Sequence, residues 1–322
     1  AQSGFLPLEK VYNWEPIPSE IKPEQRDKLL GGQANLWAEY MPDYKQAEYM
    51  IYPRLLALSE VLWATHYRDY KNFTERLVEA QQRLDYGGIN YHIPLPEGPQ
   101  AQYVEFVDSV EVELTNSLGY EIFYWTNQTN WTNWTSTTNL FNTTLLRAYT
   151  TFNGRNSDTI EVYYNKLSAP HPAAKHLLHN GLYRQRAYGY FPNTDSLDYV
   201  RFDITDLVDS LIYDRNDTYF EPWIEVYQGY MKVDSTDSYL ITTDLEELWV
   251  DDIRVINNNG RLKRNQTQRA LMVLEEGFHS IKAVYNNCVN DGFPAHWRKP
   301  EIRIKSLEEK EFRVLRPKDF YR

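Results

Sequence analysis

The sequence predicts a multidomain chain in which a helical N-terminal segment precedes two all-β domains. The chain has 322 residues, which is enough for two or three domains. Apolar residues recur at helical spacing up to about residue 86, and short alternating runs typical of strands replace them beyond Asn90. Proline-rich stretches at 94–99 and 169–172 read as linkers between the three segments.

The first segment, residues 1–95, contains a candidate strand and a candidate binding site. Residues 30–35 read as a short buried strand that leads to an aromatic residue, Trp37, and a carboxylate, Glu39. Residues two apart on an extended chain point to the same side. An exposed aromatic ring beside a carboxylate is a typical lining of a sugar pocket.

Two helices are expected after this strand. Residues 48–63 are apolar nearly all round, which favours a helix packed between two layers, with Pro53 near its first turn or at a kink. A second helix is predicted over 67–86, where apolar residues recur at helical spacing, and Gly87-Gly88 should end it.

The second and third segments, about 100–168 and 178–316, are predicted to be β-sandwiches. In the second, alternation around 110–114 and short apolar runs at 122–125 and 160–163 indicate strands. In the third, alternate residues should share one strand face, with Ser280 and Lys282 on the other. The residues of the shared face are His279, Ile281, Ala283 and Tyr285.

Two runs in the first segment carry a family resemblance. LLGGQANLWAEY (29–40) and EYMIYPRLLALSEVLW (48–63), with GFLPLEKVYNWEPIP (4–18), resemble the last strand and last helix of family 20 β-N-acetylhexosaminidases. The resemblance implies that residues 1–95 are the C-terminal remnant of a (β/α)8 TIM barrel. A complete barrel needs roughly 250 residues, and its site lies at the C-terminal ends of the strands, where the resemblance places Trp37 and Glu39.

The same resemblance implies which catalytic groups this chain lacks. Members of the family carry an adjacent Asp-Glu pair on an earlier strand, and residues 1–28 offer only scattered acids. We therefore assign no catalytic residue here and expect the chain to be an inactive C-terminal fragment. The family is an exception to the two-carboxylate retaining scheme: the 2-acetamido oxygen of the substrate attacks the anomeric carbon while an enzyme Glu protonates the leaving oxygen.

The later segments carry resemblances of their own. The run VEVELTNSLGYEIFYWT (110–126) is similar to the immunoglobulin-like domain of chitobiase-type enzymes. The runs at 229–260 and 274–285 resemble the β-sandwich of the anthrax protective antigen, which is appended to many glycosidases.

Two further groups of residues are candidate ligand sites. Trp125, Trp131 and Trp134 lie in a polar, turn-forming stretch that could contact glycans or simply cover a sandwich core. Asp251-Asp252 invites a calcium interpretation, but a hard cation needs six or more oxygens, and a plain strand-end turn is the preferred interpretation. The seven histidines show no HxxxH or HxH spacing and Cys288 is the one cysteine, so no metal and no cofactor are predicted.

The amino-acid composition limits which partners the protein can bind and where in the cell it is expected. The net charge of −11 and pI near 5.2 disfavour nucleic acid and anionic membranes. No apolar run reaches 18 residues, so no membrane span is expected, and a single cysteine rules out an intrachain disulfide framework. We expect the intact protein to be periplasmic or extracellular. Seven Asn-x-Thr sequons are attributed to the Asn- and Thr-rich composition rather than to glycosylation.

The function predicted from the sequence is therefore the C-terminal part of an exo-β-N-acetylhexosaminidase acting on terminal GlcNAc or GalNAc. The partners expected are N-acetylhexosamine-containing glycans and the missing N-terminal portion of the enzyme. The alternative is a non-catalytic carbohydrate-binding or cell-surface accessory protein. If the barrel is incomplete, residues 1–95 should be the least stable part, with fast hydrogen exchange at 29–64 and proteolysis before Pro99.

Overall fold

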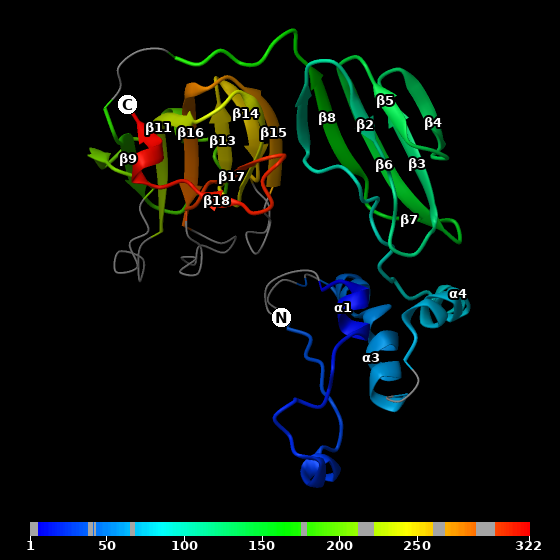
Figure 1. Cartoon of the computed structure of the whole chain (residues 1–322). Coiled ribbons are helices and arrows are strands. Elements are labelled where there is room, and N and C mark those ends of the chain that lie inside the picture. The colour runs from blue at the N-terminus through cyan, green and yellow to red at the C-terminus, as the bar shows by residue number, and fades with distance from the viewer. Residues whose placement is uncertain are drawn as a thin grey trace. The chain divides into compact units, whose positions relative to one another are not determined.

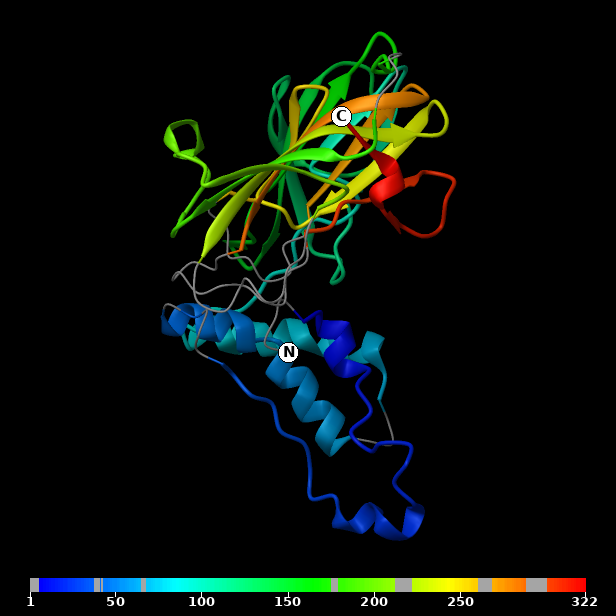
Figure 2. The same cartoon turned by 90° about the vertical axis from the view of Figure 1, so that its left-hand side faces the viewer.

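A computed structural model describes residues 6–37, 41, 43–64, 68–174, 179–211, 222–259, 268–287 and 300–322. The chain divides into two compact units. Unit 1 comprises residues 1–97, 115–123 and 149–159, and unit 2 comprises 98–114, 124–148 and 160–322. The α-helices lie between residues 8 and 86, and the strands follow from residue 103 (Figures 1 and 2). No described helix is long and apolar enough to cross a membrane.

Of the two helices predicted in unit 1, one forms as two separate helices and the other is confirmed. Residues 48–63 were expected to form one helix, but two helices share this stretch. The chain leaves helical geometry at Tyr52, because a proline at 53 disfavours a helical residue before it and donates no backbone hydrogen bond. The helix predicted over 67–86 is confirmed from Tyr70, and Gly87 caps it. The described helices are α1 (Leu8–Tyr12), the 3-10 helix η1 (Pro23–Lys28), α2 (Tyr44–Ile51), α3 (Arg54–Trp63) and α4 (Tyr70–Tyr86).

A small apolar core joins α1, α3 and α4. Its residues are Tyr12, Ala57, Val61, Phe73 and Leu77, each no more than 4% exposed. The hydroxyl of Tyr12 donates to Glu60 Oε1 at 2.8 Å and accepts from the Asp69 amide at 2.8 Å, so a buried aromatic ring also satisfies its polar end. The helices of unit 1 therefore have a core of their own.

Arg54 links the end of α2 to the start of α3. The side chain is 8% exposed, and it donates to the carbonyls of Met50 at 2.7 Å and Tyr49 at 3.2 Å. These carbonyls lie in the last turn of α2, where helical partners run out. Burial lowers the pKa of Arg54 to about 10.

Helix α4 also packs against the later segments of unit 1. Asp85 Oδ1 forms an ion pair with Arg155 Nε at 2.6 Å, and the Tyr120 hydroxyl donates to the Gln81 side chain. The rings of Tyr120 and Phe152 stack with centroids 4.2 Å apart. The C-terminal half of α4 thus packs against segments 115–123 and 149–159.

The strand predicted at residues 30–35 does not form, and this corrects the expectation. Residues 29–37 are irregular, without sheet pairing, and all are exposed; Leu30 is 98% exposed. The stretch approaches the helices at Gly32, where an added Cβ would lie 2.9 Å from Leu62 and 3.0 Å from Trp14. A strand needs a neighbour for its hydrogen bonds, and no described strand pairs with these residues.

The β-rich remainder is compatible with β-sandwich domains. A ten-stranded sheet has the order β18-β17-β12-β15-β1-β8-β6-β3-β4, with β7 paired to β6, and β2 pairs with β5 separately. Strand β1 lies between β8 and β15 and is parallel to both, so strands from the second and third predicted segments share one sheet. Strands at 110–112, 122–125 and 160–163 are confirmed, whereas the domain boundaries stay a prediction.

The strands of this sheet and of the small pair are β1 (Tyr103–Phe106), β2 (Val110–Val112), β3 (Glu121–Thr126), β4 (Thr129–Asn133), β5 (Thr138–Leu140), β6 (Thr144–Phe152), β7 (Arg155–Asn156), β8 (Ile160–Lys166), β12 (Asp237–Thr243), β15 (Gln268–Leu274), β17 (Arg303–Ser306) and β18 (Arg313–Val314).

A seven-stranded sheet in unit 2 has the order β10-β9-β11-β16-β13-β14, with β19 paired to β11. Its inner face packs with residues of β12, β15 and β17 into the main core, as in a sandwich. The predicted shared face is confirmed, because His279, Ile281, Ala283 and Tyr285 are no more than 4% exposed. The strands are β9 (Leu182–Tyr188), β10 (Ile204–Val208), β11 (Trp223–Val233), β13 (Glu247–Val250), β14 (Ile253–Asn257), β16 (Gly277–Asn286) and β19 (Phe320–Tyr321).

A buried carboxylate secures β1 against β15. Glu105, 1% exposed, accepts from the Val273 amide at 3.1 Å and pairs with His171 Nε2 at 2.8 Å. The Tyr103 hydroxyl donates to the same carboxylate at 2.8 Å. The hydrogen bond to Glu105 raises the pKa of His171 above its ordinary value of 6.5, with burial opposing and Asp251 adding to the rise.

This pair predicts a pH dependence of stability. Because folding raises the pKa of His171, its contribution is fully present below pH 6.5 and is lost as pH rises through the raised value. The Tm difference between the wild type and His171→Gln should therefore be largest near pH 5.5 and shrink towards pH 8.5. Thermal denaturation at several pH values measures it, with His179→Gln as the control, since no ion pair is described for His179. A Tm difference independent of pH would contradict the prediction.

Candidate functional site

Trp37 lies at the end of the exposed stretch 29–37. This residue is 50% exposed, so about half of its surface is open to solvent. Glu39 lies outside the described residues. The role predicted for the two residues stays a prediction.

Unit 1 has several large apolar side chains that are exposed, besides Trp37. Leu30 is 98% exposed and Trp63, on α3, is 89% exposed. Trp14, Leu36 and Leu55 are each more than 40% exposed.

The three tryptophans weighed as glycan contacts do not converge on a described pocket. Trp125 lies beneath the Arg147 guanidinium at 5.4 Å, and Trp134 meets the Tyr124 ring edge-on at 5.0 Å. Trp131 lies on β4 and is 45% exposed. The rings of Trp125 and Trp134 thus pack against other side chains of the protein, and glycan contact by this stretch stays a prediction.

Asp251-Asp252 forms the two-residue turn between β13 and β14. Both residues have positive φ, 47° and 63°, as a type I′ hairpin turn requires. Both carboxylate oxygens of Asp251 are engaged, one with the Ser280 amide at 3.0 Å and one with His279 Nδ1 at 2.6 Å. The turn interpretation is confirmed. Among the described residues no cluster of three or more metal-ligating side chains occurs, and Cys288 lies outside them.

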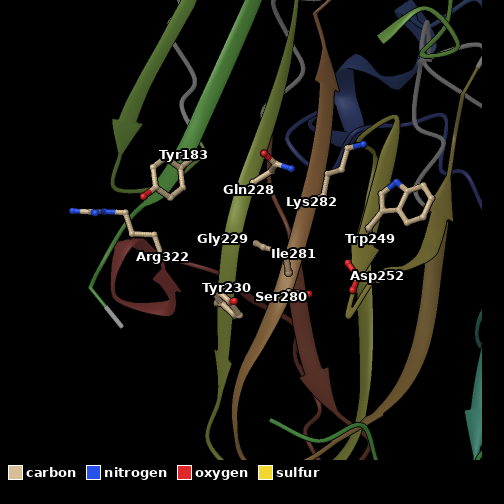
Figure 3. A pocket seen from close by; sticks show the side chains of 10 residues that line it. All are labelled: Tyr183, Gln228, Gly229, Tyr230, Trp249, Asp252, Ser280, Ile281, Lys282 and Arg322. Atoms are coloured by element: carbon tan, nitrogen blue, oxygen red, sulfur yellow. The ribbon is translucent and has the colours of Figure 1, made fainter. Parts of the chain in front are cut away.

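A hollow of about 530 Å³ lies on the outer face of the seven-stranded sheet. Tyr183, Gln228, Lys282 and Trp249 line it from four neighbouring strands (Figure 3). The sequence pattern places Lys282 on the outer face of its strand, but it gives no signal for the register that brings the four side chains together. These residues were not predicted as a site.

Comparisons with known proteins point to a glycosidase family. Residues 1–66 match the family described as glycosyl hydrolase family 20, catalytic domain. A β-hexosaminidase of Porphyromonas gingivalis is 31% identical over 336 residues, covering 98% of this chain and 42% of the relative. A chitooligosaccharidolytic β-N-acetylglucosaminidase of Ostrinia furnacalis is 34% identical over 95 residues, covering 30% of this chain and 16% of the relative. The chain thus spans less than half the length of these relatives.

Part of the chain is also similar to solved structures. The PA14 domain of the MpAFP antifreeze protein matches with a TM-score of 0.33 and 13% identity, covering 48% of this chain and 96% of that one. This score is too low to assign the fold. The sequence matches, in contrast, relate residues 1–66 to the catalytic domain of glycosyl hydrolase family 20 and nearly the whole chain to part of a β-hexosaminidase.

Proposed function

We propose that the chain is the C-terminal part of an exo-acting β-N-acetylhexosaminidase that removes terminal GlcNAc or GalNAc from glycans. The match of residues 1–66 to the family's catalytic domain supports this proposal, as do relatives named β-hexosaminidases. The observation that carries it is the stretch 29–37, which has an unpaired backbone and exposed apolar side chains. As the last strand of a closed barrel, the same residues would gain two neighbours and bury Leu30.

In this proposal Trp37 forms a wall of the sugar site. A tryptophan presents a large flat apolar face on which the C–H face of a sugar ring can stack, while its N–H remains available for a polar contact. Glu39 would accept hydrogen bonds from hydroxyls at the non-reducing end. Both residues would stand at the C-terminal end of a barrel strand, where sites of this fold are built.

The bond-breaking groups would come from residues that precede this chain. By resemblance to the family, the 2-acetamido oxygen attacks the anomeric carbon, a Glu donates a proton to the leaving oxygen, and water then opens the oxazolinium intermediate. We also propose that the intact protein is periplasmic or extracellular and acts on N-acetylhexosamine-containing glycans. The preceding portion of the enzyme would cover the apolar side chains of unit 1.

Hydrolysis of a chromogenic N-acetylglucosaminide tests the proposal. The 322-residue chain alone should show no turnover, whereas a protein that includes the preceding coding sequence should be active. In that longer protein, Trp37→Ala should lower kcat/KM by about 10²-fold, as expected for about 3 kcal/mol of lost contact in the transition state. Trp37→Phe should retain most of the activity.

Tyr199→Ala serves as the matched control, because Tyr199 is 91% exposed and lies in unit 2. An unchanged kcat/KM in Trp37→Ala would limit Trp37 to a packing role. Turnover by the given chain that survives repurification would overturn the assignment of catalysis to the preceding residues.

A further inference from the structure

We propose that the outer face of the seven-stranded sheet is a binding site for a short acidic oligosaccharide. The side chains that form it are Tyr183, Gln228, Lys282 and Trp249, called here the cross-strand row. This site lies entirely in unit 2, and the proposal does not depend on hydrolysis by the barrel.

The sheet register aligns the four residues. Tyr183 on β9 is opposite Gln228 on β11, Gln228 is opposite Lys282 on β16, and Lys282 is opposite Trp249 on β13. Three inter-strand spacings place the backbones of Tyr183 and Trp249 about 14 Å apart. An aromatic residue thus stands at each end, with an amide and an ammonium group between them (Figure 3).

A neighbouring part of this face is covered, whereas the row is open. Farther along the same strands, Ile224, Val226 and Val284 lie beneath apolar side chains of the loop 189–203. The cover ends before Gln228, which is exposed, and Tyr183 is 50% exposed. The hollow of about 530 Å³ falls within the range of small-ligand sites.

Trp249 is held in place before any ligand binds. Its indole N–H donates to Glu247 Oε2 at 2.9 Å, and Thr194 Oγ1 donates to Glu247 Oε1 at 2.7 Å. Glu247 is only 7% exposed. Because the ring is already ordered, the Trp249 side chain loses little entropy when a ligand binds, which suits a stacking surface for a sugar ring.

The charge of the hollow selects an acidic ligand. Lys282 and Arg322 both line it, and neither has an ion pair in the described part of the chain; the Lys282 ammonium lies 5.6 Å from the Trp249 ring centroid. Asp252 is the one side-chain carboxylate among the lining residues, against the two cationic side chains of Lys282 and Arg322. The chain as a whole has a net charge of −11, which makes two cations without acidic partners a local feature.

Isothermal titration of the chain with three tetrasaccharides tests the proposal. N-acetylchitotetraose is neutral, a hyaluronan tetrasaccharide carries carboxylates alone, and a chondroitin sulfate tetrasaccharide adds sulfates. Both acidic ligands should bind at least about tenfold more tightly than the neutral one at low salt, which corresponds to about 1.4 kcal/mol. Their affinity should fall as salt is raised. Comparison of the two acidic ligands distinguishes carboxylate from sulfate as the preferred group.

Variants assign any binding to the row. Lys282→Gln should remove the preference for acidic ligands, and Tyr183→Ala should weaken all binding about tenfold. The matched controls are Lys305→Gln, whose ammonium lies 5.3 Å from the Phe312 ring centroid outside the hollow, and the exposed Tyr199→Ala. No binding by any probe, equal affinity for neutral and acidic probes, or equal losses in the control variants would overturn the proposal.

Discussion

Glu225→Gln should lower the free energy of unfolding of unit 2 by about 3–5 kcal/mol, the usual effect of breaking a buried ion pair from one side. Glu225 is fully buried in the main sandwich. Its Oε1 accepts from Arg186 Nε at 2.8 Å and Arg184 Nη1 at 3.3 Å, and its Oε2 accepts from the Tyr227 hydroxyl at 2.7 Å. An amide at this position removes the charge that balances two guanidinium groups and turns one acceptor into a donor.

Asp206→Asn is the matched control for this experiment. Asp206 binds Arg184 at 2.6 Å, and the hydrogen bond from Arg184 lowers the pKa of Asp206. Its side chain, however, is 40% exposed, so water can replace the lost partner. Its loss should cost less than about 1 kcal/mol. Urea denaturation followed by tryptophan fluorescence measures both variants, and equal losses would contradict the buried role of Glu225.

The sequence predicted those helices and strands that depend on residues close together in the chain. Helix α4 follows from its apolar spacing and the glycine at its end, and the buried face of β16 follows from alternation around Ile281. The turn at Asp251-Asp252 was predicted from the resemblance instead, because the pair matches the position of a strand-end turn in the domain that this segment resembles.

Features that depend on distant parts of the chain were missed. Residues 30–35 read LGGQAN, which contains few residues that favour strands, and the segment cannot by itself supply the neighbour that a strand needs. The pairing of β1 with β15 joins residues more than 160 positions apart. The cross-strand row depends on the register of three strand pairs, which no single segment encodes.

Hydrogen exchange should separate the stretch 29–37 from the rest of unit 1. No backbone hydrogen bond between described residues protects the amides of residues 30–37, so they should exchange at nearly the rate of an unfolded chain. Ala57 and Val61, in contrast, are fully buried on α3. Fast exchange was expected from the sequence for all of residues 29–64, and the structure limits this expectation to residues 30–37. Central amides of β16 should exchange at least about 10³-fold more slowly, since they open with much of the global unfolding free energy.

Mass spectrometry of deuterated peptides measures this difference in exchange rate. If the proposed function is correct, the fast exchange of residues 30–36 depends on the absence of the neighbouring barrel strands. In a protein that includes the preceding barrel strands, residues 30–36 should become protected, because neighbouring strands would then supply backbone partners and cover Leu30. The exchange of β16 should not change, since its partners β11 and β13 are already present. Protection of residues 30–36 in the given chain equal to that of β16 would show that this stretch is ordered without a barrel, and the role proposed for Trp37 at a barrel strand end would fail.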